Sequence, residues 1–327
     1  MNLRLLVLAS LFLALLLPAA VIAADGKTLD EAMNALEYAR DWEGMQGRMA
    51  KATPEELASE EGWLWQAQIA LMLRDRAKAE SLLAGAQQLF PDSGRLELLR
   101  TGVMLLGLND VGAVGAVRLG RRLRQGLERA VALDPDSTAA RIALIQYYLN
   151  APRVVGGGVR RADEHIDHLK TISMAAYFEV LAQRAAIAGD WANAVTWMQQ
   201  AFHEQPNELR ALSLGTTLQM AQRFDEARAQ FQALIEDNPG HGAGWYQLGR
   251  TSVLAERWLD EGRAAFKQFL ALPHWPNDPS PAAAWWRIGQ LEALDKSPEQ
   301  ARAAFEQALS LDPEFGPAQE ALSEIQR

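Results

Sequence analysis

The chain has 327 residues, a formal net charge of −9 and no cysteine. An acidic chain is a poor candidate for nucleic-acid binding, and the absence of cysteine excludes disulfide bonds and thiolate chemistry. The chain is too long for one compact core, yet no linker rich in proline, glycine and serine divides it. A linear array of repeats resolves this, because each repeat buries surface only against its neighbours.

Residues 1–24 have the pattern of a secretory signal peptide. Arg4 and the free amine form a short positive region, an apolar run follows from Leu5 to Leu17, and the segment ends in small residues. We expect cleavage after Ala23 or Ala24 and export to the periplasm of a Gram-negative bacterium, with no membrane span in the mature chain. The alternative is an uncleaved leader that anchors the protein in the inner membrane, because the apolar run approaches the ~20 residues of a span.

Residues 25–59 are predicted to form a degenerate N-terminal helical hairpin. Thr28 to Glu31 and Thr53 to Glu56 both have the capping-box pattern that begins a helix, and Trp42–Ala50 has the length of a partner helix. From Glu60 onward a regular skeleton of apolar and small residues begins. Its first members are Trp63, Ala67, Ala70, Ala79, Leu83, Ala86 and Pro91.

Residues 60–173 continue as helical pairs with two departures from the regular spacing. We expect an insertion at 107–117, a Gly/Val-rich stretch before a helix that resumes near Leu123. A second insertion, at 150–158, is a swollen turn that contains three consecutive glycines.

Residues 175–314 have the most regular spacing, with Pro206 and Pro239 standing 33 residues apart. A connector at 273–281 contains four prolines, and residues 315–327 are predicted to form an amphipathic helix that caps the array. No long segment of the mature chain alternates with period two, so we expect no sheet.

The skeleton is most complete between Ala282 and Glu314. Its members there are Trp285, Ile288, Gly289, Ala301, Phe305, Ala308 and Pro313. Small residues at 289 and 301 let two helices approach closely, and Pro313 ends the second helix. This skeleton resembles the tetratricopeptide repeat, a helical hairpin with a period of ~34 residues. The resemblance implies an all-α, right-handed superhelical solenoid of about eight repeats plus a capping helix.

The resemblance also implies which residues line the concave face, since the first helix of each repeat faces inward. On this chain they are Gln68, Gln146, Glu179, Gln183, Thr216, Tyr246, Arg250, Trp286 and Gln290. Tyr246, Arg250 and Trp286 are typical anchors of protein interfaces, although packing between repeats is an equal alternative for them. The Lys/Asn/Lys/Arg clamp with which the chaperone-binding branch of the family holds a terminal carboxylate is not found.

Two neighbouring segments contain residue types that bind small ligands. His165 and His168 stand one helical turn apart and are weak candidates for a transition-metal site, with a solvated helix face as the alternative. Gly156–Gly158 precedes Arg160 and Arg161, where a helix start could hold an anion. A permissive loop is the alternative for the glycines.

A third cluster is a stripe of arginines on one helix. Arg118, Arg121, Arg122 and Arg129 share one side of it at 3.6 residues per turn. Such a stripe could meet an acidic partner or anionic lipid, or be an ordinary solvated face.

No spacing of Ser/His/Asp, Cys/His or paired carboxylates indicates catalysis, so we predict a non-enzymatic protein without a cofactor. The primary hypothesis is a scaffold or adaptor of the bacterial cell envelope that binds a protein or peptide in its concave groove. The alternative is a periplasmic carrier of a small molecule or metal ion that uses the segment around Gly156–Gly158, His165 and His168. A homo-oligomer is compatible with either hypothesis.

Overall fold

The computed structural model describes residues 28–38, 40–273, 275 and 278–325. Helices account for its regular structure, and these ranges contain no strand, which confirms the predicted all-α class. The expected leader, 1–24, lies outside the described residues. The chain divides into two compact units, Met1–Val180 and Leu181–Arg327. Among the described helices, none is both long enough and apolar enough to cross a bilayer.

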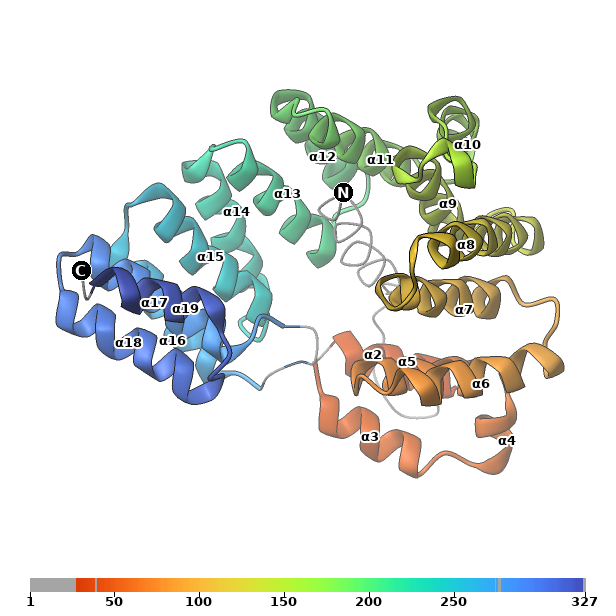
Figure 1. The fold of residues 1–327 in the computed structure, drawn as a ribbon, viewed down its shortest axis with the longest axis horizontal. Helices are drawn as coiled ribbons and strands as arrows, with labels where there is room; N and C mark the ends of the chain where they lie inside the picture. The colour runs from red at the N-terminus through yellow and green to blue at the C-terminus, as the bar shows by residue number, and fades with distance from the viewer. Residues whose placement is uncertain (1–27, 39, 274, 276–277, 326–327) are drawn as a thin grey trace. The chain divides into compact units, whose positions relative to one another are not determined.

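The first unit begins with the helices α2 to α6 (Figure 1). Its opening elements are α2 (Leu29–Tyr38), α3 (Trp42–Ala50), the short α4 (Pro54–Ala58), α5 (Glu60–Met72) and α6 (Arg76–Leu89). Both predicted capping boxes are confirmed. The amide of Thr28 donates to Glu31 at 3.0 Å, and the amide of Glu31 donates back to the Thr28 hydroxyl at 3.3 Å. Thr53 and Glu56 repeat this exchange at 2.9 and 3.2 Å.

The rest of the first unit contains both departures from the regular spacing. Its elements are α7 (Gly94–Leu106), η1 (Gly107–Asp110), α8 (Ala113–Leu133), α9 (Thr138–Asn150), η2 (Arg153–Val155) and α10 (Val159–Ile172), with α11 (Met174–Ile187) crossing into the second unit. Residues 113–117 of the expected insertion are already helical, so α8 starts ten residues before Leu123 and reaches 21 residues. The expectation that this helix resumes near Leu123 was therefore wrong.

The second insertion packs against α8 at Gly120. A Cβ on Gly120 would lie 2.9 Å from Cγ1 of Val155, so the glycine lets η2 sit directly on α8. The hydroxyl of Tyr147 lies 2.7 Å from the carbonyl oxygen of Gly120 and 3.0 Å from that of Val155. These contacts hold η2 on the N-terminal half of α8.

The second unit is a series of regular hairpins. Its elements after α11 are α12 (Trp191–Glu204), α13 (Glu208–Met220), α14 (Phe224–Asp237), α15 (Gly242–Ala255), α16 (Leu259–Ala271), α17 (Pro281–Leu294), α18 (Pro298–Leu311) and α19 (Gly316–Ile325). The connector 273–281 includes residues 274 and 276–277, which lie outside the described part. Helix α19 packs on α18 and buries Ala318 completely, as a capping helix should.

One glycine–phenylalanine pair recurs in three successive hairpins of this unit. A Cβ would lie 2.3 Å from the Phe231 ring at Gly215, 2.7 Å from the Phe266 ring at Gly249 and 2.3 Å from the Phe305 ring at Gly289. Each ring therefore occupies the space that a larger residue on the facing helix would fill.

Polar contacts between hairpins also follow the repeat period. Arg228 binds Glu261 with both guanidinium arms at 2.6 and 3.0 Å, across 33 residues of sequence. Arg263, on α16, donates to Glu292 at 2.9 Å and also pairs with Asp295, so it joins α16 to the end of α17.

Candidate functional site

A polar network joins α13 to α15, the first helices of two successive hairpins in the second unit, and an arginine of α17 lies beside it. Gln219, on α13, is 2% exposed, and its amide nitrogen donates to the Gln247 carbonyl oxygen at 3.0 Å and to the Thr251 hydroxyl at 2.8 Å, both on α15. Its amide oxygen accepts a hydrogen bond from Arg250 Nη1 at 3.0 Å. Burial fixes Gln219, and Gln219 in turn orients Arg250.

Two guanidinium groups stand close together in this network. Burial, and then the neighbouring Arg287, lower the pKa of Arg250, but a guanidinium stays protonated at neutral pH. Among the described residues both arginines bond only neutral amide oxygens: Arg250 bonds those of Gln219 and Gln247, and Arg287 bonds that of Gln290 at 2.9 Å. Two like charges are thus half-buried together, and no carboxylate of the described residues pairs with either.

Arg287 has capacity left for a ligand. Its guanidinium lies 4.2 Å from the centre of the Trp286 ring, while its Nε is buried with no hydrogen-bond partner in the described part of the chain. A buried donor without a partner costs free energy, so the guanidinium of Arg287 is incompletely satisfied by the described part of the chain. We call Gln219, Gln247, Arg250, Arg287 and Gln290 the arginine cluster.

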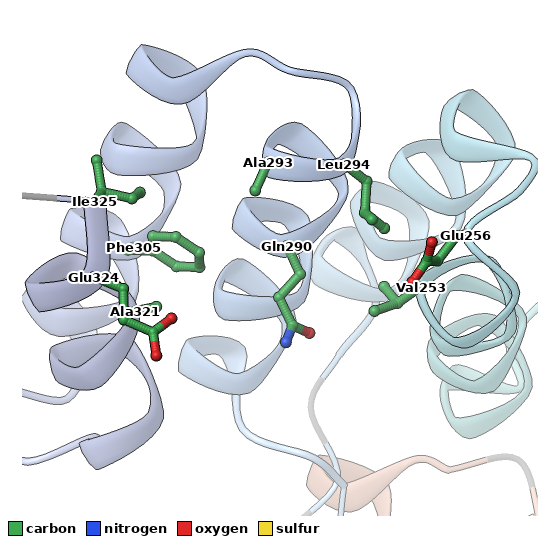
Figure 2. Close-up of a pocket in the computed structure, with 9 residues that line it drawn as sticks. All are labelled: Val253, Glu256, Gln290, Ala293, Leu294, Phe305, Ala321, Glu324 and Ile325. Carbon is green, nitrogen blue, oxygen red and sulfur yellow. The ribbon is translucent and has the colours of Figure 1, made fainter. Parts of the chain in front are cut away.

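Next to this cluster lies an open cavity of about 530 Å³, shown in Figure 2. Val253 and Leu294 line one side of it, Phe305 and Ile325 line the other, and Gln290 lies between them. Glu256 and Glu324 contribute carboxylates, also on opposite sides. We call this cavity the terminal pocket.

Gln290 belongs to both features and so makes them one continuous site. The arginine cluster has the donors that bind carboxylates in forked geometry. The terminal pocket has the apolar lining that takes an aliphatic or aromatic side chain. Together they can hold an extended segment that combines an acidic residue with a large apolar one.

Three of the residues predicted from the sequence fall in or beside this site. Arg250 and Gln290 belong to the arginine cluster. Trp286 stacks on Arg287 and meets the ring of Phe315 edge-on at 6.0 Å, so it supports the cluster from one side.

Tyr246 needs correction as a partner-binding residue. It is 7% exposed, and its ring lies 5.5 Å from Phe266 and 5.4 Å from Phe269 in edge-to-face contacts. Packing between helices, the alternative left open by the sequence, accounts for this residue.

The remaining predicted residues lie outside the arginine cluster. Gln146, on α9, is 3% exposed and so belongs to the interior of the first unit, which corrects its expected place on an open face. Gln68, Glu179, Gln183 and Thr216 are half-buried.

Sequence reasoning missed Arg287, Gln219 and Gln247. Gln219 stands three residues after Thr216, which is a spacing that also faces inward in the repeat, so the same rule could have found it. Arg287 has no such signal, because it directly follows Trp286 and turns inward through its stacking on that ring.

The two histidines considered for a metal lie in a different setting. The ring of His165 stacks on Tyr148 at 5.7 Å, and its Nδ1 lies 3.2 Å from Arg141 Nη1. Burial, and then Arg141, lower the pKa of His165, so the ring is neutral and accepts from the guanidinium. No three His, Asp or Glu side chains converge for a metal in the described ranges.

The glycine loop uses its own amides. Gly156 donates to the Arg153 carbonyl oxygen at 3.0 Å, Gly157 to that of Pro152 at 3.2 Å and Gly158 to that of Tyr148 at 2.8 Å. Gly156 has a φ of 98°, a value that favours glycine. The loop is therefore a folded turn whose three glycine amides donate to backbone carbonyl oxygens, in keeping with the permissive-loop alternative.

Comparison with known proteins finds a family model that matches part of the chain and solved structures of similar fold. The model of the tetratricopeptide repeat family matches residues 212–258 and 254–314. The general transcriptional corepressor ssn6 of Schizosaccharomyces pombe is 28% identical over 155 residues, which are 47% of this chain but only 14% of that protein.

Two solved structures resemble the whole chain in fold. In the APC/C hetero-tetramer Cut9-Hcn1, the similarity covers 91% of this chain and 55% of the other, with 16% identity and a TM-score of 0.54. In the human IFIT1 dimer with PPP-AAAA, the similarity covers 90% of this chain and 71% of the other, with 13% identity and a TM-score of 0.56. Identities this low show the shared helical-repeat fold alone.

Proposed function

Because this chain is a tetratricopeptide repeat protein, we propose that it is a non-catalytic adaptor that holds an acidic segment of a partner protein at the arginine cluster. Proteins of this family are generally scaffolds for protein–protein interaction. The observation that carries the finer proposal is the half-buried pair Arg250 and Arg287, which has only neutral acceptors around it.

Charge and shape together define the segment. An acidic residue would replace water at the two guanidinium groups, where partial burial strengthens a charge-assisted hydrogen bond. A neighbouring Leu, Ile or Phe would enter the terminal pocket beside Gln290. Because helix pairs hold these groups in place, the segment alone bears the ordering cost of binding.

A displayed library of random dodecapeptides tests this proposal. Selection on the wild-type chain is expected to enrich peptides that contain Asp or Glu beside a large apolar residue. Arg250→Gln/Arg287→Gln should weaken the enriched peptides at least ~10-fold, since charged hydrogen bonds contribute more than 1.4 kcal/mol. Ala293→Trp, which fills the terminal pocket, should weaken them without changing the charge.

A matched control removes the same charge elsewhere. Arg223 and Arg302 are exposed and ion-paired with Glu226 and Glu306, so Arg223→Gln/Arg302→Gln should leave peptide binding unchanged. The proposal fails if the arginine-cluster variant keeps its thermal midpoint and binds the selected peptides as tightly as the wild type.

We further propose that the adaptor works in the periplasm of a Gram-negative bacterium. The signal-peptide pattern of residues 1–24 supports this proposal. Fusion of residues 1–40 to a reporter that is active only after export should give activity, and the mature protein should begin at Ala24 or Asp25. An inactive reporter would overturn the assignment, whereas an active reporter on an uncut chain would favour the anchored alternative.

A further inference from the structure

Helix α8 presents one exposed side that is rich in arginine. Counted at 3.6 residues per turn, the side chains fall within about 100° of arc. They are Val114, Arg118, Arg121, Arg122, Gln125 and Arg129, and all are exposed. We call them the α8 stripe. The opposite side buries Leu123, Leu127 and Ala130 against the rest of the first unit.

The charge of this stripe is not neutralised by the protein. No acidic residue occurs between Asp110 and Glu128 in the sequence. Among the described residues, Arg118, Arg121 and Arg122 form no ion pair, whereas other exposed arginines of this chain do. Three unpaired guanidinium groups on one helix are unusual in a protein with a net charge of −9.

Exposed apolar side chains accompany the arginines. Val111, just before α8, and Val114, in its first turn, are 40% and 77% exposed, and Val154, in η2, and Val159, at the start of α10, are 60% and 51% exposed. The contact of Gly120 with Val155 holds the second insertion against the flank of α8. That insertion adds the exposed Arg153 and Arg160, and no acidic residue occurs between Asp136 and Asp163.

Both departures from the repeat period thus place exposed arginines and isolated valines on elements that pack together, and we call the α8 stripe with these neighbours the basic surface. We propose that this surface, on the first unit and independent of the arginine cluster, binds the anionic headgroups of a phospholipid bilayer. Guanidinium groups match phosphate in forked geometry, and protruding aliphatic side chains can enter the headgroup region of a membrane. An acidic protein would satisfy the arginines but leaves the scattered valines unexplained.

Vesicle co-sedimentation tests this surface directly. The chain from residue 25 onward is used, because the apolar leader would itself bind lipid. It should sediment with phosphatidylcholine vesicles that contain about 30% phosphatidylglycerol, but not with pure phosphatidylcholine, and less at ~0.5 M than at ~0.05 M NaCl. Arg118→Gln/Arg121→Gln/Arg122→Gln should weaken binding about 100-fold, at about fivefold for each arginine near the surface.

Two further variants separate the effect of the α8 stripe on vesicle binding from a general loss of positive charge and from binding to any polyanion. Arg223→Gln/Arg257→Gln/Arg302→Gln removes the same charge from exposed ion-paired positions and should change binding less than threefold. Val114→Gln should weaken binding to vesicles but leave binding to soluble poly-glutamate unchanged. The proposal is overturned if the wild-type chain does not bind vesicles that contain phosphatidylglycerol, or if the control triple variant loses as much vesicle binding as the α8-stripe variant. It is also overturned if the arginine changes weaken binding to poly-glutamate but not to vesicles.

Discussion

At the residue scale, Gly289 controls how closely α17 and α18 approach. A Cβ there would lie 2.3 Å from the ring of Phe305, which is 3% exposed and cannot move freely. Gly289→Ala should therefore destabilise the second unit by ~1–3 kcal/mol through overpacking. Urea unfolding followed by circular dichroism measures this change.

Gly47, in α3, is the matched control. Nothing lies within 4 Å of a Cβ at that position, so Gly47→Ala should be neutral or stabilise its helix by ~0.5–1 kcal/mol. Equal urea midpoints for Gly289→Ala and Gly47→Ala would show that the packing of the Phe305 ring does not require a glycine at position 289.

A second residue makes stability depend on pH. Burial, and then the nearby Asp30, raise the pKa of Glu37 to about 7. Between pH 4.5 and 7 the folded state holds this proton more tightly than the unfolded state, so the contribution of Glu37 to stability falls as pH rises through that window. The loss is on the order of 1–3 kcal/mol once partial exposure is considered.

Glu37→Gln should remove this dependence. The difference in unfolding free energy between variant and wild type should grow from pH 4.5 to 7 and stay constant above it. A difference that is flat over the same range, measured in urea, would mean that Glu37 titrates normally in the folded chain.

At the scale of elements, one hydroxyl fastens the second insertion to α8. Burial raises the pKa of Tyr147 to about 12, so its hydroxyl stays a donor between the carbonyl oxygens of Gly120 and Val155. Tyr147→Phe should cost ~1–2 kcal/mol and speed amide hydrogen exchange in residues 151–158.

Tyr246→Phe provides a like-for-like comparison for this experiment. Its ring contacts stay intact, and its hydroxyl has no hydrogen-bond partner among the described residues. If both variants exchange alike at 151–158, the Tyr147 hydroxyl does not hold the insertion.

The helices themselves were largely predictable from the sequence, because their signals are local. The capping residues Thr28 and Thr53 mark two starts, and the recurring small residues mark where helices cross. The early start of α8 was not predictable. The glycines and β-branched valines of residues 111–117 have weak helix propensity, so local pattern alone gives no start at Ala113.

The candidate site was predictable only in part, for a similar reason. Spacing shows which side of a helix faces inward, and this identified Arg250 and Gln290. It does not show how much of that side the next hairpin covers, so Tyr246 and Gln146 were expected on a surface although they are buried. Arg287 was missed because its place depends on Trp286.

At the scale of the whole molecule, both proposed binding sites lie where the packing of the repeats leaves positive charge without a carboxylate partner among the described residues. Several exposed arginines of this acidic chain have a carboxylate partner, as Arg223 has in Glu226 and Arg302 in Glu306. The arginine cluster of the second unit and the α8 stripe of the first do not. We propose these two surfaces as the places where the chain binds acidic ligands.

Crosslinking from position 290 tests the central claim most directly. A photo-reactive amino acid replaces Gln290, which lies in the terminal pocket, and in a second chain it replaces Gln307, which is exposed on α18. With an acidic peptide from the library selection, illumination should give an adduct at 290 that Arg250→Gln/Arg287→Gln abolishes, and none at 307. Equal adducts at both positions, or an adduct at 290 that persists without the two arginines, would contradict the account.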